Sequence, residues 1–171
     1  MTVTIPVLTT ERLTLRAPTL PDFEVWADYY ASDRSVWEDG PLPRAQAWRI
    51  WCADQAQWLL RGYGPFGVQS RADGTYLGEV GIYHRDDFPA PELGWFLRPE
   101  AEGKGYGAEA ARAVLVWARA QFGWDELVNY IAPGNTRSIA LALRLGGQQV
   151  DGLPGTAPDD VVIRHDLRGL A

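Results

Sequence analysis

The chain has 171 residues, of which 46% are hydrophobic and 22% are charged, and its formal net charge is −6. This length and composition predict a single globular domain spanning residues 1–171 and exclude a largely disordered chain. The single cysteine, Cys52, excludes an internal disulfide and a cysteine-rich zinc site. The two histidines, His84 and His165, lie far apart and form no metal-binding motif. We therefore expect no metal.

The negative charge also bears on partners. Repulsion from phosphates argues against nucleic acid, whereas an acidic protein favours encounters with cations such as amines. No apolar run approaches the roughly 20 residues of a membrane span. The N-terminus shows no basic segment followed by an apolar one. We therefore expect a cytoplasmic protein with neither a membrane nor a nucleic-acid partner.

The first half of the chain predicts a strand, two helices and a hairpin. Alternation of apolar and polar residues favours strands, and apolar residues at helical spacing favour helices. The Asp73-Gly74 pair predicts a tight turn. In chain order, the elements are a strand at 12–17, a helix from Pro21, a loop at 33–43, a helix at 44–61, and strands at 66–71 and 75–84.

The second half predicts strands and helices that alternate. The elements are a strand at 92–97, a helix from about 108 to 122, a strand at 127–132, a helix at 135–145, and short strands at 148–151 and 160–166. An antiparallel hairpin followed by strand-helix-strand units indicates an α/β fold of the mixed, α+β-like kind. We expect one mixed, mostly antiparallel sheet of about seven strands with four helices.

A glycine-rich turn follows the strand at 92–97 and reads Glu102-Gly-Lys-Gly-Tyr-Gly-Ala108. Glycines allow positive φ and close approach of a ligand, and the N–H groups at a helix start attract negative charge. The turn therefore predicts a phosphate site. A P-loop is excluded because Gly105 follows Lys104. A dinucleotide fingerprint also fits Gly103, Gly105 and Ala108, but it lacks the carboxylate expected after the next strand.

This turn resembles the pyrophosphate loop [Q/R]xxGx[G/A] of the GNAT superfamily of acetyl-CoA-dependent N-acetyltransferases. Downstream, Asn135, Ser138 and the Leu145-Gly146 pair resemble the family's NxxS…LGF segment. Residues 10–16, Thr-Glu-Arg-Leu-Thr-Leu-Arg, look like the opening of the RimJ/RimL-like branch, which acetylates protein N-termini. The resemblance covers nearly the whole chain and implies the GNAT fold.

The resemblance implies that the chain binds acetyl-CoA as a co-substrate and acetylates a primary amine by direct transfer in a ternary complex. The acceptor would be a protein N-terminus or a small molecule. The alternative is a non-catalytic CoA-binding sensor or interaction module with the same fold. The implied cofactor-binding residues are Phe96, Leu97, Arg98, Gly103, Lys104, Gly105, Tyr106, Gly107, Ala108, Asn135, Arg137 and Ser138.

The chain departs from the family pattern at several positions. Glu102 stands where Gln or Arg is usual, and its carboxylate would repel a pyrophosphate unless it points to solvent and Lys104 compensates. Gly147 replaces the aromatic residue of the LGF segment. Residues 140–144 contain no tyrosine to serve as general acid. These departures leave the non-catalytic alternative open.

Transfer to an amine requires a base, which a nearby carboxylate can supply. Glu92 is our first candidate, because it shares a strand face with Gly94 and the resemblance lays that strand beside the thioester. The alternative is a strand-end carboxylate in water. Glu79, within an apolar strand, is the second candidate, and such a buried carboxylate needs a partner or a raised pKa. Ser138 is the third predicted catalytic residue, bonding the CoA arm or sulfur, or else an ordinary first-turn serine.

The early loop supplies the predicted acceptor contacts. The resemblance places the first two helices over the acceptor site. Trp37, Glu38 and Asp39 would then wall a pocket for a cationic, partly apolar amine. Glu38 and Asp39 are also further candidates for the base. The alternative for the tryptophans between Trp26 and Trp58 is an aromatic core or the face of a homodimer.

Overall fold

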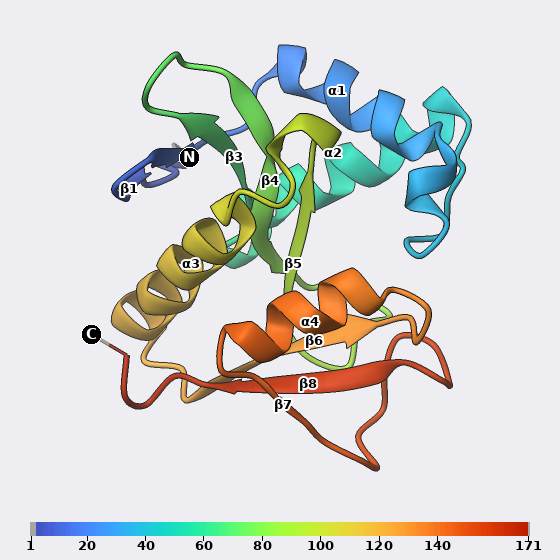
Figure 1. Cartoon of the computed structure of the whole chain (residues 1–171), viewed down its shortest axis with the longest axis vertical. Coiled ribbons are helices and arrows are strands. Elements are labelled where there is room, and N and C mark those ends of the chain that lie inside the picture. The colour runs from blue at the N-terminus through green and yellow to red at the C-terminus, as the bar shows by residue number, and fades with distance from the viewer. Residues whose placement is uncertain (1–2, 171) are drawn as a thin grey trace.

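The computed structural model describes residues 3–170 and contains one mixed sheet with four α-helices (Figure 1). The strands are β1 (Leu8–Thr9), β2 (Leu13–Arg16), β3 (Pro65–Ser70), β4 (Tyr76–Tyr83), β5 (Glu92–Leu97), β6 (Glu126–Ile131), β7 (Gln148–Gln149) and β8 (Val161–Asp166). The helices are α1 (Leu20–Tyr30), α2 (Arg44–Arg61), α3 (Tyr106–Phe122) and α4 (Thr136–Arg144). The strand order is β1-β2-β3-β4-β5-β6-β8-β7, and only β5 and β6 pair in parallel. The expected fold class is therefore confirmed.

The strand count is eight within the described residues, where the sequence predicts about seven. The additional strand is β1, which pairs Leu8 with Leu15 of β2. Two residues are too few to show the alternation that identifies a strand. Two single turns of 3-10 helix, η1 (Asp33–Ser35) and η2 (Pro99–Ala101), also lie in segments without a predicted element.

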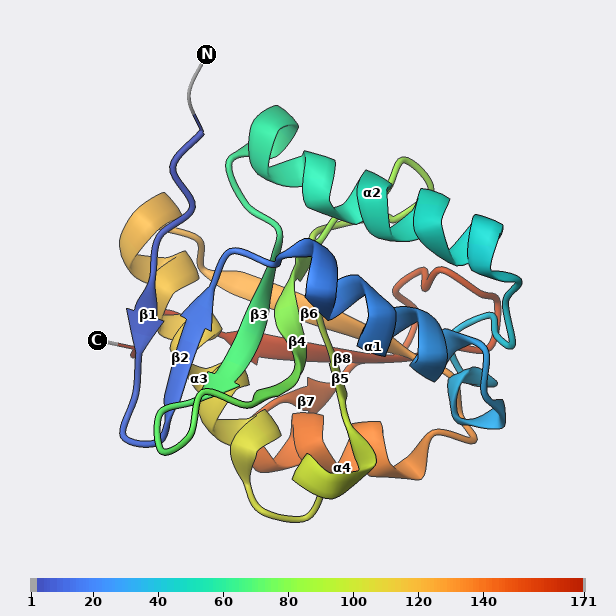
Figure 2. The ribbon, with the colours of Figure 1, turned by 90° about the horizontal axis from the view of Figure 1, so that it is seen from above.

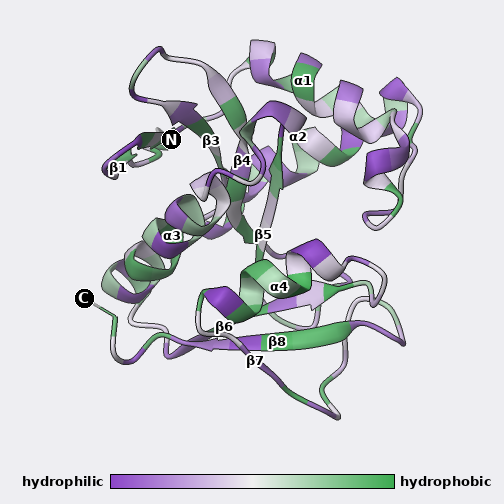
Figure 3. Ribbon diagram, viewed as in Figure 1, coloured by the Kyte–Doolittle hydropathy of each residue, from purple (hydrophilic) through white to green (hydrophobic). Residues whose placement is uncertain are grey.

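Local sequence signals explain where the helices begin and end. Asp22 accepts a hydrogen bond from the main-chain N–H of Thr19 at 2.7 Å and so caps the start of α1. Gly62, with φ of 77°, ends α2 in the left-handed conformation. Figure 3 shows hydrophobic and hydrophilic residues alternating along α3, as expected for a helix that packs one side against a sheet.

The helices cover both faces of the sheet (Figure 2). On one face, Val80 and Ile82 of β4 pack with Val114 of α3 in the main apolar core. On the other face, Phe96 of β5 packs with Trp26 of α1 and with residues of α2. Because side chains of β5 alternate between the faces, Glu92 and Gly94 point to the same side as Phe96.

The sheet opens between β5 and β6. These two strands share one register pair, Glu92 with Val128, although both strands continue beyond it. In Figure 1, β5 stands steeply while β6 and β8 run almost horizontally. The two parts of the sheet therefore diverge after Glu92, and the edge of β5 up to Leu97 is not paired with β6.

Candidate active site

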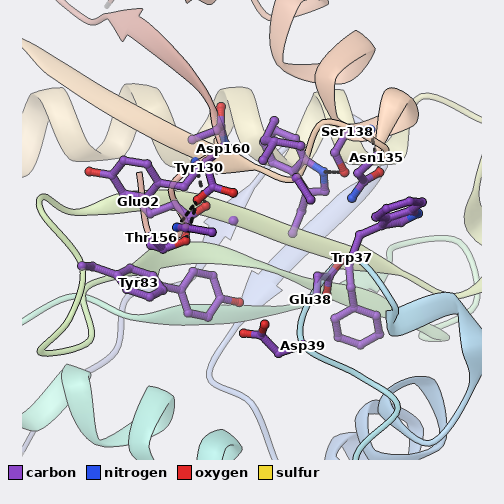
Figure 4. A pocket seen from close by; sticks show the side chains of 18 of the residues that line it. Trp37, Glu38, Asp39, Tyr83, Glu92, Tyr130, Asn135, Ser138, Thr156 and Asp160 are labelled. Carbon is purple, nitrogen blue, oxygen red and sulfur yellow. Dashed lines mark hydrogen bonds between the residues drawn. The ribbon is translucent and has the colours of Figure 1, made fainter. Parts of the chain in front are cut away.

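A cavity of about 350 Å³ lies where β5 and β6 diverge. It is lined by side chains of β4, β5 and β6, by the loop that follows η1, and by the start of α4. Five of the six residues that the sequence predicts for catalysis and acceptor binding line it together: Trp37, Glu38, Asp39, Glu92 and Ser138 (Figure 4). Phe96 and Asn135, which the resemblance implies for the cofactor, also line it.

Glu92 takes part in the junction between the two strands. Its Oε1 accepts a hydrogen bond from the main-chain N–H of Tyr130 at 3.0 Å. The side chain of Asn129 donates to the carbonyl of Leu93, so two polar side chains replace missing ladder bonds. Burial raises the pKa of Glu92 to about 8, although the bond from Tyr130 acts in the opposite direction. Within residues 3–170, Oε2 of Glu92 accepts no hydrogen bond and is free for a ligand.

Glu38 is held by two tyrosines of α1. Its oxygens accept hydrogen bonds from the hydroxyls of Tyr29 at 2.9 Å and Tyr30 at 3.1 Å. Burial raises the pKa of Glu38 to about 7, and these two bonds offset part of the effect. Asp39 is exposed at the pocket mouth, with φ of 65°. Both carboxylates therefore face the pocket, as the sequence predicts, but only Glu38 is fixed in place.

Trp37 closes one side of the pocket. Its ring lies against the backbone of Gly134, in the turn between β6 and α4. Figure 4 shows the indole beside Asn135 and Ser138. The loop after η1 and the start of α4, which lie far apart in the sequence, therefore meet at this aromatic contact.

Glu79 lies behind the pocket wall. It is completely buried, and its Oε1 accepts a hydrogen bond from the hydroxyl of Tyr83 at 3.1 Å. Burial, reinforced by the charge of Asp54, raises the pKa of Glu79 to about 8. The Tyr83 ring lines the pocket and lies across Gly94, where a Cβ would fall 2.8 Å from it. Glu79 reaches the pocket through Tyr83, a residue that the sequence analysis missed.

An ion pair between Arg85 and Asp54 forms another part of the wall. Arg85 donates to both carboxylate oxygens, at 2.9 and 2.7 Å, and Asp54 is 1% exposed. The sequence signal is weak, because Arg85 precedes two aspartates in an apparent surface loop. Asp54, however, lies three residues after Trp51 and four before Trp58, on the buried side of α2, and such a carboxylate needs a cation.

The glycine-rich turn adopts the backbone that its sequence predicts. Gly103 and Gly105 have φ of 72° and 81°, and Gly105 caps α3. Within residues 3–170, the main-chain N–H groups of 103–108 have no hydrogen-bond acceptor. These groups, with the start of a long helix, fit a pyrophosphate. The geometry of the turn therefore suits an anion, and its use by the cofactor stays a prediction.

The residues at the start of the chain brace this turn. Glu109, in the first turn of α3, accepts hydrogen bonds from the hydroxyl of Thr10 at 2.6 Å and from Arg12 Nε at 2.6 Å. Arg12 also donates to the carbonyl of Lys104 at 2.9 Å, and its guanidinium lies over the ring of Tyr106. The Thr-Glu-Arg opening therefore has a structural role at the glycine-rich turn.

Asn135 and Ser138 lie at the start of α4. The side chain of Asn135 accepts a hydrogen bond from the main-chain N–H of Ser138 at 3.3 Å, which is the helix cap. The indole N–H of Trp95 donates to the hydroxyl of Ser138 at 3.3 Å. Ser138 thus faces β5 across the opening. Both residues therefore have a structural role, and their contacts with CoA stay a prediction.

Glu102 is partly exposed, and its charge is compensated by arginines and not by Lys104. It accepts hydrogen bonds from Arg34 of η1 through Oε1 and from Arg137 of α4 through Oε2, the latter at 2.6 Å. Lys104 is exposed. Arginines from two distant segments therefore neutralise the carboxylate that the sequence marks as unfavourable for a phosphate.

Two further findings concern the described part of the chain as a whole. No helix among residues 3–170 combines the length and apolar character required to cross a membrane. The same residues contain no group of three or more His, Cys, Asp or Glu side chains placed to hold a metal ion.

Residues 12–148 match the model of the acetyltransferase (GNAT) domain. The chain belongs to this family. Its structure is similar to the crystal structure of an acetyltransferase from Agrobacterium tumefaciens, with 39% identity, a TM-score of 0.91, and 96% of each chain covered. It is also similar to a putative ribosomal-protein-serine acetyltransferase from Vibrio cholerae, with 25% identity, a TM-score of 0.73, and 97% and 99% covered. The expected likeness to the RimJ/RimL-like branch is thereby confirmed.

Among curated proteins, the chain is 30% identical over 126 residues to the L-methionine sulfoximine/L-methionine sulfone acetyltransferase of Pseudomonas aeruginosa. The match covers 71% of this chain and 70% of that protein. The chain spans 48% to 70% of the length of the curated relatives that it matches. GNAT acetyltransferases use acetyl-CoA and act on amine acceptors, so the family-level assignment as an N-acetyltransferase is confirmed.

Proposed function

We propose that the protein transfers the acetyl group of acetyl-CoA to a primary amine by direct attack in a ternary complex. The supporting observation is that one helix, α4, lies against both the glycine-rich turn and the pocket lined by carboxylates. Gly107 of that turn packs closely on Leu141 of α4. Ser138, one turn earlier on the same helix, lines the pocket.

The residues present fit the donor. Unpaired N–H groups of 103–108 would hold the pyrophosphate, and the edge of β5 at Phe96 and Leu97, followed by Arg98, would accompany the adjoining arm. Ser138 and Asn135 would lie on the opposite side. Acetyl-CoA supplies the acetyl group as a thioester. The chain supplies orientation and proton transfer.

Glu92 is our proposed base. Its Oε1 is fixed by the Tyr130 N–H, which aims the remaining oxygen into the pocket. A carboxylate with a pKa of about 8 is a stronger base than an ordinary glutamate, and once ionised it can accept a proton from an ammonium group. In Glu38, by contrast, tyrosine hydroxyls occupy both oxygens. We assign Glu38 to acceptor binding, together with Trp37 and Asp39.

The proposed acceptor is a small primary amine, with a protein N-terminus as the second possibility. Support for a small molecule comes from the cavity volume of about 350 Å³. The Pseudomonas relative, named for acetylation of two methionine derivatives, points the same way. The Arg34 and Arg137 pairs remove the repulsion at Glu102 that favoured a non-catalytic module.

The test is a thiol-release assay with acetyl-CoA against amines, amino acids that include methionine sulfone, aminoglycosides and peptides. We expect turnover with at least one small amine and loss of turnover in Glu92→Gln. CoA binding without turnover on any acceptor would instead support the non-catalytic alternative. Absence of CoA binding would overturn the proposal.

A further inference from the structure

An ion triad joins the cofactor loop to the acceptor loop. Glu102, immediately before the glycine-rich turn, pairs with Arg34 and Arg137. Arg34 also donates to the carbonyl of Leu97, at the end of β5, at 3.4 Å. Its segment, η1, leads directly into Trp37 and the rest of the pocket wall. The Arg34 side chain therefore spans the route between the loop and the opening.

The triad is a poor structural support. The Arg137 side chain is 70% exposed, and those of Arg34 and Glu102 are about one-third exposed. Ion pairs at such exposure contribute little to folding stability. Two guanidinium groups share one carboxylate, so an excess positive charge remains beside the unpaired N–H groups of 103–108. The planar donor fork of arginine matches a phosphate as well as a carboxylate.

We propose that Arg34 and Arg137 bind the phosphates of acetyl-CoA, and that Glu102 is the anion that holds them in place before the cofactor arrives. This inference rests on the proposed function and adds Arg34, a residue of the acceptor side, to the donor site. When acetyl-CoA binds, a phosphate replaces the carboxylate of Glu102. Arg34 keeps its segment anchored in both states, so the acceptor wall is always fixed.

The first test measures CoA binding by calorimetry. The affinity for CoA should fall about tenfold in Arg34→Gln and in Arg137→Gln, since each change removes a charged hydrogen bond to phosphate. The affinity for CoA should rise about threefold in Glu102→Gln, because the change removes an anion that competes with the phosphate. Arg44→Gln, which breaks the exposed Arg44–Glu24 pair elsewhere, is the matched control and should change nothing. Melting temperatures establish that each variant is folded.

The second test measures hydrogen exchange of the amides of Ser35, Val36, Glu38 and Gly40, which donate to carbonyls of residues 32–35. In the parent protein they should exchange slowly with and without CoA. In Glu102→Gln they should exchange about tenfold faster without CoA and slow again when CoA, but not pantetheine, is added. In Arg34→Gln they should exchange fast in both conditions.

The outcomes separate this inference from the proposed function. If the parent protein does not bind CoA, the proposed function fails. If the parent binds CoA and Arg34→Gln binds it equally well, Arg34 is not a phosphate ligand and the inference alone is overturned. Fast exchange in Glu102→Gln that CoA does not reverse would likewise overturn it, since the triad would then be structural.

Discussion

The indole of Trp37 lies so close to the backbone of Gly134 that a Cβ built on Gly134 would fall 2.1 Å from the ring. The φ of Gly134 is not positive, so the backbone conformation does not require glycine here. The contact with the Trp37 ring does. The fit places the ring over the start of α4, next to Ser138. The acceptor pocket therefore depends on the absence of one side chain in the turn after β6.

Gly134→Ala is expected to displace the Trp37 ring and open the pocket. Because Trp37 belongs to the proposed acceptor wall, kcat/KM for the acceptor should fall by about tenfold, mainly through KM, while CoA affinity stays within about threefold. Steady-state kinetics and calorimetry provide the measurement. Trp37→Ala should reproduce the effect, and Gly134→Ala should add little to it. Independent, additive losses would mean that the two residues do not act through one contact.

Glu92→Gln is expected to lower kcat/KM by at least about tenfold at neutral pH, since general-base help is worth about 10² to 10⁴ in rate. A glutamine oxygen can still accept the Tyr130 N–H, so the junction should persist and CoA affinity should stay within about threefold. The base works only when ionised, so the parent rate should rise with pH through the Glu92 pKa of about 8. A variant with the same pH profile as the parent would contradict the assignment.

Glu79→Gln should change stability more than rate. The pKa of Glu79 is raised to about 8 in the folded protein, whereas an unfolded chain titrates near its ordinary value of about 4.3. The folded state then holds the extra proton between those values, and stability falls as pH rises through them. We expect Glu79→Gln to flatten this loss in denaturant titrations between pH 5 and 9. Loss of activity in Glu79→Gln but not in Glu92→Gln would reverse the two roles.

Gly105→Val is expected to abolish CoA binding. The φ of 81° disfavours a β-branched residue, and the new Cβ would fall 3.3 Å from Nη2 of Arg12, whose guanidinium braces this turn. Gly123→Val is the matched control, because Gly123 ends α3 with φ of 68° and has open space around it. The two variants should lose similar amounts of folding stability, but only Gly105→Val should lose CoA binding. Equal CoA binding in the two variants would exclude this loop as the cofactor site.

His165 should make the fold sensitive to acid. It is buried, with Nε2 2.6 Å from the side-chain oxygen of Asn129, and burial lowers its pKa to about 4. An unfolded histidine titrates near 6.5. The unfolded chain therefore binds more protons between those values, and stability should fall as pH drops from about 6.5 to 4. His165→Gln should show a shallower decline in melting temperature. If the melting temperature of His165→Gln declines with acid as steeply as that of the parent, other groups cause the acid sensitivity.

The sequence predicts those features whose signals are local. Helical periodicity identifies α3, and the glycines around Gly105 identify the anion-binding turn, because a strand, a turn and a helix start are adjacent in the chain. The shared face of Glu92, Gly94 and Phe96 also follows from alternation along one strand. These features fix the fold class and the donor side of the site.

The contacts that the sequence does not reveal join distant segments. Arg34 and Arg137 meet at Glu102 only after η1 and α4 are placed around the end of β5. The sequence around a charged loop residue does not show which residue will pair with it. From the sequence alone, Glu102 is therefore expected to repel a phosphate. The hydrogen bond from the Tyr130 N–H to Glu92 is equally hidden in the sequence, since it depends on where β5 and β6 cease to pair.

The junction between β5 and β6 divides the sheet into two parts. One contains β1 to β5 with α1 to α3, and the other contains β6 to β8 with α4. Between the strands there is one register pair, reinforced by the side chains of Glu92 and Asn129. A molecule bound along this opening would contact both parts of the sheet and hold them together. Donor binding should therefore raise the midpoint of the thermal transition, because a ligand that binds only the folded state stabilises that state.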